Sequence, residues 1–150
     1  MSSDTEARAE RLRRGAILLL SAAGVLVAAY LSWVALGDGE VACGPVGDCH
    51  TVQSSRYSEV VGVPVALLGL GMYVALLGLA VVALVAGGGA PRAIAAWTFA
   101  FSLGGVLYSA YLTYLELAVI DAICSWCVVS ALLVTAIFAL SVPWGPPRRP

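Results

Sequence analysis

The sequence predicts an all-α membrane protein, a bundle of four transmembrane helices with an outer loop between the first and second helices. Hydrophobic residues make up 61% of its 150 residues and charged residues only 11%, whereas a soluble domain has about 25% charged residues. Four apolar runs each exceed the ~20 residues that cross the hydrocarbon layer of a bilayer. A chain of this length has no core large enough to bury them, so we expect one domain in lipid.

The first predicted helix covers about residues 15–36 and ends at a Gly-Asp-Gly sequence that starts at Gly37. Residues 1–14 form a short cytoplasmic segment with four arginines, Arg8, Arg11, Arg13 and Arg14. A cleaved signal peptide is the alternative for this region. The apolar run is longer than a typical signal core of about 7–15 residues, which favours a retained membrane helix.

The other three predicted helices cover about residues 60–86, 92–115 and 122–142. Pro64 lies near the start of the second helix, where its missing N–H is tolerated, and Gly87–Gly89 end that helix. Pro143 ends the fourth helix and begins a tail, residues 143–150, that we expect in the cytoplasm.

The basic residues predict the orientation of the helices. Seven of the eight lie before the first helix, between the second and third, or after the fourth, and the exception is Arg56. Because cytoplasmic segments are enriched in Lys and Arg, we expect a multi-pass protein of the inner (plasma) membrane with both termini in the cytoplasm. The loop at residues 37–59 and the connection between the third and fourth helices then face outward.

The four cysteines fall into two close-spaced pairs. Cys43 and Cys49 enclose a Gly-Pro-Val-Gly-Asp turn in the outer loop, and Cys124 and Cys127 form a CSWC motif at the start of the fourth helix. Both pairs are expected on the side of the membrane where disulfides persist. A helix N-terminus and the Cys-x-x-Cys spacing both favour a thiolate, and two dithiols can exchange through a mixed disulfide. The pattern predicts a thiol–disulfide relay.

Two other interpretations of the cysteines stay open. They could form two structural disulfides, and four cysteines allow three pairings. Four thiolates also suit zinc, although this spacing fits a zinc site less well than two Cys-x-x-Cys motifs. The zinc interpretation would make the chain a non-enzymatic membrane metal-binding or assembly factor. A transporter is disfavoured because no charged residue lies at a helix centre, and no basic stripe indicates nucleic acid binding.

Two further groups of side chains lie near the outer ends of the helices. Glu116 and Asp121 flank the turn between the third and fourth helices, and we expect both carboxylates in interfacial water, with a part in proton release as the alternative. Tyr108, Tyr111 and Tyr114 recur at every third residue, which predicts helix packing, with pocket lining as the alternative.

The order of these motifs resembles the vitamin K epoxide reductase (VKOR) family, and its bacterial members in particular. The residues that carry the resemblance are CGPVGDCHTVQSSRYSEVVGVPVALLGLGMY and, about 50 residues later, AICSWCVVS. The resemblance covers about residues 15–142. It implies a four-helix bundle around a quinone, ubiquinone or menaquinone, with the Cys-x-x-Cys pair at the outer rim and no metal at the site.

The resemblance also implies roles for single residues. Cys124 and Cys127 would be the active-site pair, with Cys127 the member that meets the quinone. Cys43 and Cys49 would be the shuttle pair. Ser55 matches a family serine near the active site.

Three more positions are expected near the quinone. Trp126 lies inside CSWC, where contact with the quinone or a partner and anchoring at the membrane interface are equally open. Ala131 stands where vertebrate members have a tyrosine, and Val65 where they have an asparagine. Both departures fit a quinone held mainly by apolar contacts and argue against reduction of vitamin K epoxide.

The function implied by the resemblance is a quinone-dependent protein-disulfide oxidoreductase, DsbB-like in role. It would reoxidise a separate thioredoxin-like, DsbA-type partner outside the cytoplasm for disulfide bond formation in exported proteins. Electrons would pass from the partner to Cys43 and Cys49, then to Cys124 and Cys127, and finally to membrane quinone.

Overall fold

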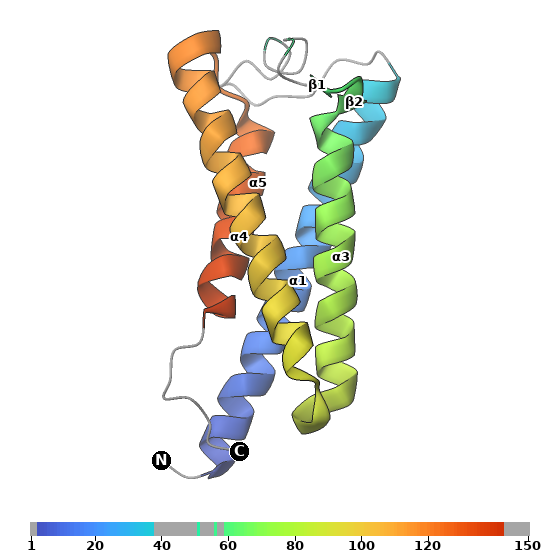
Figure 1. Ribbon diagram of the computed structural model, residues 1–150, viewed down its shortest axis with the longest axis vertical. Helices are drawn as coiled ribbons and strands as arrows, with labels where there is room; N and C mark the ends of the chain where they lie inside the picture. Colours follow the sequence, from blue (N-terminus) through green and yellow to red (C-terminus); the bar gives the residue numbers. More distant parts are fainter. Residues whose placement is uncertain (1–2, 38–50, 52–55, 57–58, 143–150) are drawn as a thin grey trace.

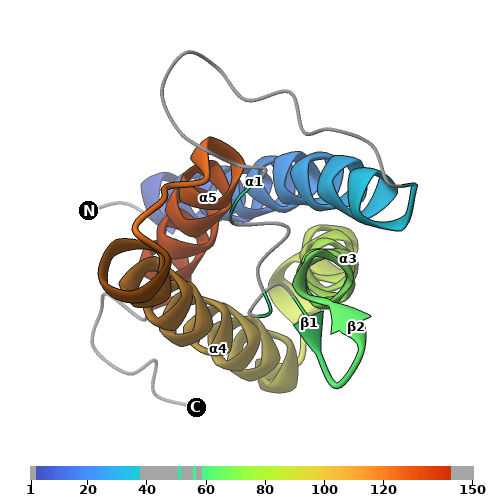
Figure 2. The ribbon, with the colours of Figure 1, turned by 90° about the horizontal axis from the view of Figure 1, so that it is seen from above.

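A computed structural model of the protein describes residues 3–37, 51, 56 and 59–142. This part of the chain forms an antiparallel bundle of four long helices: α1 (Ser3–Leu36), α3 (Val65–Ala86), α4 (Arg92–Leu115) and α5 (Ser125–Ser141). Successive helices run in opposite directions (Figure 1). Seen along the bundle they follow one another around a centre (Figure 2), and each packs on its two neighbours. The predicted all-α membrane bundle is confirmed.

The helices differ in length. Three helical segments, residues 3–36, 65–89 and 92–120, are long and apolar enough to cross a membrane. α5 is as apolar but has only 17 residues, which rise about 25 Å. Figure 1 shows that α5 begins below the highest point of the chain that connects it to α4. We call the end of the bundle where α5 begins the CSWC end.

The helix bounds depart from the prediction in three places. α1 begins at Ser3, because residues 6–14 consist entirely of Glu, Ala, Arg and Leu, which favour helix although most of them are charged. α3 begins at Val65, since the residues before it form a hairpin. α5 begins at Ser125, whereas the bounds of α4 are as predicted.

The hairpin pairs β1 (Glu59–Val60) with β2 (Val63–Pro64) in antiparallel register. Its two turn residues have positive φ, 53° at Val61 and 81° at Gly62, as a tight two-residue hairpin turn requires. Glycine adopts this conformation without strain, whereas a β-branched valine does so rarely.

Tyr73 of α3 occupies the centre of the bundle and is fully buried. Its ring lies against Gly24 of α1 so closely that a Cβ at residue 24 has no room. Its hydroxyl donates to the carbonyl oxygen of Ser130 on α5 at 2.7 Å and lies 3.0 Å from the Ser130 hydroxyl. One side chain therefore joins three helices.

Two arginines of α1 hold the opposite end of the bundle together. Arg14 donates from Nη1 to the carbonyl oxygens of Ala83, at 2.8 Å, and Gly87, at 2.6 Å, where α3 ends. Arg13 donates to the carbonyl oxygen of Leu140 in the last turn of α5, at 2.7 Å. The last carbonyls of a helix carry partial negative charge, and the Ala83 and Gly87 carbonyls accept a guanidinium N–H in addition to the backbone N–H groups of Gly87 and Ala90. Both guanidinium groups therefore act as C-terminal caps from another helix.

Candidate active site

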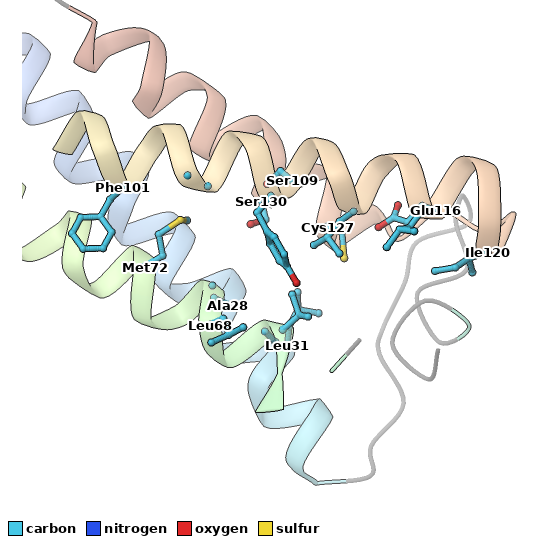
Figure 3. Close-up of a pocket in the computed structure, with 18 of the residues that line it drawn as sticks. Ala28, Leu31, Leu68, Met72, Phe101, Ser109, Glu116, Ile120, Cys127 and Ser130 are labelled. Carbon is cyan, nitrogen blue, oxygen red and sulfur yellow. The ribbon is translucent and has the colours of Figure 1, made fainter. Parts of the chain in front are cut away.

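A cavity of about 390 Å³ lies at the CSWC end, between α1, α3, α4 and α5 (Figure 3). This volume is within the range of about 300–1,000 Å³ typical of small-molecule sites. Its walls are mostly apolar, with Leu31, Met72 and Phe101 among them, while Cys127, Glu116 and Ser130 contribute polar atoms. The cavity suits a mainly apolar ligand that meets a few polar groups.

The CSWC motif places its two cysteines differently. Cys124 is the N-cap residue of α5, and its sulfur accepts the backbone N–H of Cys127 at 3.4 Å. Cys124 is fully buried, whereas Cys127 forms part of the cavity wall. Because both lie at a helix N-terminus, backbone N–H groups and the helix dipole favour negative charge on sulfur there.

Glu116 lies beside this pair, which corrects its expected place in interfacial water. Its side chain is buried, with 4% exposed, and its Oε2 accepts the backbone N–H of Cys124 at 3.3 Å. It also forms a side-chain hydrogen bond with Cys127. Asp121, the other carboxylate of the turn, is exposed.

Glu116 continues the face of α4 that lines the cavity, where Phe101, Gly105, Ser109 and Leu112 precede it at intervals of three or four residues. Glu116 begins a π-helical turn, η3 (Glu116–Ile120), whose wider spacing differs from the 3.6-residue period used for prediction. The Ala122 N–H closes the turn on the Glu116 carbonyl at 3.0 Å, and Asp121 follows with φ +56°. Hydropathy gives no signal for a buried carboxylate at this position.

The other predicted quinone contacts separate into two groups. Val65 lines the cavity together with Cys127. Trp126 instead packs on Tyr30 of α1, with ring centroids 5.3 Å apart. Neither Trp126 nor Ala131 is among the described residues that line this cavity. The roles assigned to these three residues remain predictions.

Cys43, Cys49 and Ser55 lie outside the described residues, as do most of the predicted outer loop and the tail, residues 143–150. The shuttle pair and the serine therefore stay predictions. The four-thiolate metal site depends on Cys43 and Cys49 as well, so it also stays open.

The cavity includes residues that the sequence analysis did not assign to a site. Ser130 follows Cys127 by three residues, which is one helical turn, so its place on the same face was available from the spacing. Tyr108 lines the cavity, as the alternative for the tyrosine series allowed. Tyr111 and Tyr114 are exposed by 51% and 62%, which suits positions that face lipid.

The sequence model of the vitamin K epoxide reductase family matches residues 16–142. The match contains the CSWC motif, Glu116 and the whole cavity. Members of this family are membrane oxidoreductases that link thiols to quinones. A chain matched over most of its length, with its Cys-x-x-Cys pair beside an apolar cavity among membrane helices, belongs to the vitamin K epoxide reductase family.

Proposed function

We propose that this protein is a quinone-dependent protein-disulfide oxidoreductase that reoxidises a thioredoxin-like, DsbA-type partner. The observation that carries the proposal is the position of Cys127, whose side chain forms part of the wall of a mostly apolar cavity. A thiol at this place meets whatever occupies the cavity. A family that links thiols to quinones supports a quinone as that occupant.

The residues of the cavity fit a quinone. Apolar side chains such as Leu31, Met72 and Phe101 suit a ring and an isoprenoid tail that enter from lipid. Cys127, Glu116 and Ser130 offer polar atoms to the ring oxygens. A bound quinone supplies an acceptor for two electrons, and the protein supplies the dithiol.

The electron path that we propose uses both cysteine pairs. A reduced partner attacks the Cys43–Cys49 disulfide, forms a mixed disulfide and leaves oxidised. The reduced loop pair then reduces the Cys124–Cys127 disulfide by the same exchange. Cys127, as a thiolate, passes the electron pair to the quinone, and the Cys124–Cys127 disulfide forms again.

The arrangement of charges supports an outward position for the CSWC end. Arg13 and Arg14 cap helix C-termini at the opposite end of the bundle, and Arg92 begins α4 there. Since the basic end is expected in the cytoplasm, the CSWC end faces the compartment in which disulfides form. We place the protein in the inner (plasma) membrane with both termini cytoplasmic.

The test is a coupled assay in detergent with protein purified under anaerobic conditions. A reduced DsbA-type protein and a soluble quinone are added, and quinone absorbance and partner thiols are followed together. We expect one quinone reduced for each partner disulfide formed. Cys127→Ser should abolish the coupling, whereas Val129→Ala, a change at an exposed position of the same helix, should preserve it.

Two results would contradict the proposal. One is normal partner oxidation by Cys127→Ser. The other is an absence of coupling with both ubiquinone and menaquinone analogues, together with near-stoichiometric zinc in the purified protein. That second result would favour the metal-binding alternative.

A further inference from the structure

We propose that Glu116 is a catalytic acid–base residue, which takes the proton of the Cys127 thiol when the dithiol is oxidised and then releases it toward the reduced quinone. The proposal rests on the proposed function, because it assigns a proton-transfer role within the same site.

The contacts of Glu116 support this role. Its carboxyl is a hydrogen-bonding partner of the Cys127 side chain and of the Cys124 backbone N–H. It therefore touches both members of the reacting pair. Figure 3 shows the Glu116 and Cys127 side chains close together on the wall of one cavity. A proton can pass between them without a change of helix position.

The burial of Glu116 argues against a purely structural role, because a neutral side chain could make the same hydrogen bond at a lower cost in free energy. A carboxylate removed from water in a membrane protein is strongly disfavoured unless it is paired or protonated. An amide or hydroxyl would accept the Cys124 N–H with no charge to bury. The hydrogen bond to the Cys127 thiol instead lets the carboxyl and the thiol share one proton.

The overall reaction balances with this assignment. Oxidation of the dithiol breaks two S–H bonds, forms one S–S bond and sends two electrons to the quinone. The Cys127 proton moves first to a Glu116 carboxylate oxygen, which leaves the thiolate. One proton from Glu116 and one from Cys124 complete the quinol, and Glu116 returns to the carboxylate.

The other titratable groups near the CSWC motif are less suited to this transfer. Asp121 is on the same turn but is exposed. Three tyrosines are also nearby. Tyr30 packs on Trp126, and the Tyr73 hydroxyl is hydrogen-bonded to Ser130. Tyr108 lines the cavity from α4. Phenols are much weaker acids than carboxyl groups. Among the described residues, Glu116 is the carboxyl that contacts the pair.

The test compares Glu116→Gln, Glu116→Asp and the control Asp121→Asn in a Cys43→Ser/Cys49→Ser background. In this background a small dithiol reduces the CSWC pair directly, so no partner is needed. Glutamine keeps an oxygen that can accept the Cys124 N–H but cannot hold the proton. Two quantities are measured: the rate of quinone reduction, and the rate at which iodoacetamide alkylates reduced Cys127 across a pH series, assigned by mass spectrometry.

We expect Glu116→Gln to lower the rate of quinone reduction by about 10²-fold, the lower range of general acid–base effects. Cys127 should at the same time be alkylated faster at a given pH, because a neighbouring negative charge that opposes the thiolate is gone. Glu116→Asp should recover part of the rate, and Asp121→Asn should match the background protein in both measurements. A role confined to the hydrogen bond with the Cys124 N–H would leave quinone reduction by Glu116→Gln near the background rate, because glutamine keeps that acceptor.

The proposal is overturned if Glu116→Gln reduces quinone at the background rate, or if its alkylation profile does not move. Failure of the background protein itself to reduce any quinone would instead contradict the proposed function, while the alkylation series would still decide whether Glu116 and Cys127 share a proton. If Glu116→Gln does not fold, the infrared difference spectrum between oxidised and reduced unmodified protein decides. It should show a change in a carboxylate stretching band, because the Cys127 S–H that contacts Glu116 exists only in the reduced protein. This band should shift in Glu116→Asp, and an unchanged carboxylate region would overturn the proposal.

Discussion

The ring of Tyr73 on α3 lies directly against the backbone of Gly24 on α1. Small residues allow such close approach between membrane helices. The same tyrosine reaches Ser130 on α5, one turn beyond Cys127. Packing at this contact therefore sets the position of the helix that carries the reactive pair.

Gly24→Ala should destabilise the bundle. A Cβ at this position meets the fully buried Tyr73 ring, and overpacking of this kind costs about 1–3 kcal/mol. Thermal unfolding in detergent should show a clearly lower Tm. Gly71→Ala is the control, because a Cβ there meets nothing within 4 Å. Equal Tm values for the two variants would contradict the close contact.

Tyr73→Phe should separate the hydrogen bond of this tyrosine from its packing. The ring and its contact with Gly24 remain, whereas the bonds to Ser130 are lost. Hydrogen bonds between membrane helices contribute about 0.6–2 kcal/mol, so the fall in Tm should be smaller than for Gly24→Ala. Tyr111→Phe, at a half-exposed position, should leave Tm unchanged. A larger loss from Tyr73→Phe than from Gly24→Ala would reverse this ranking.

Arg14→Met should loosen the end of the bundle opposite the cysteines. It removes the donor to the Ala83 and Gly87 carbonyls and one of the two arginine partners of Glu10. Hydrogen bonds from charged groups contribute about 1.5–3 kcal/mol, and partial exposure of this side chain reduces the effect. We expect a lower Tm and faster hydrogen exchange in the last turn of α3. Arg11→Met, at an exposed position, should change neither, and similar exchange in both variants would count against the cap.

Gly104→Leu should fill the cavity without disturbing the helices. Gly104 lines the cavity, and a Cβ there meets nothing within 4 Å. Lost room in an apolar pocket changes binding by about 10-fold or more, so the KM for quinone should rise by at least that factor. The Tm should stay near that of the unmodified protein. Gly71→Leu is the matched control, and an unchanged KM for Gly104→Leu would place the quinone elsewhere.

Hydropathy and motif spacing predicted the bundle because membrane helices must be long, apolar and internally hydrogen-bonded. The same approach missed the first turns of α1, because those residues form helix through their helix propensity and are not apolar. It also missed the hairpin before Val65. Hydropathy and motif spacing did not predict the π-helical turn either. Glu116 instead lies on the face of α4 that lines the cavity, in helical spacing with Ser109 and Leu112, but hydropathy gives no reason to expect a buried carboxylate there.

The candidate site was predictable only where a motif marks it. The CSWC spacing identified Cys124 and Cys127, but only the family resemblance indicated that Cys127 is the one that meets the ligand. The difference between the two cysteines arises from the N-cap geometry of Cys124 and the helical position of Cys127. The walls come from segments as distant in sequence as Leu31 and Ser130, and tertiary packing alone brings these together.

The short length of α5 has a consequence for electron transfer from a soluble protein to a lipid-soluble acceptor. Since α5 starts below the top of the bundle and the described residues bury Cys124 fully, a folded protein in solution cannot contact the Cys124 sulfur directly. The proposed relay, in which a second cysteine pair passes electrons to the CSWC pair, would then be a requirement set by a helix a few turns shorter than its neighbours.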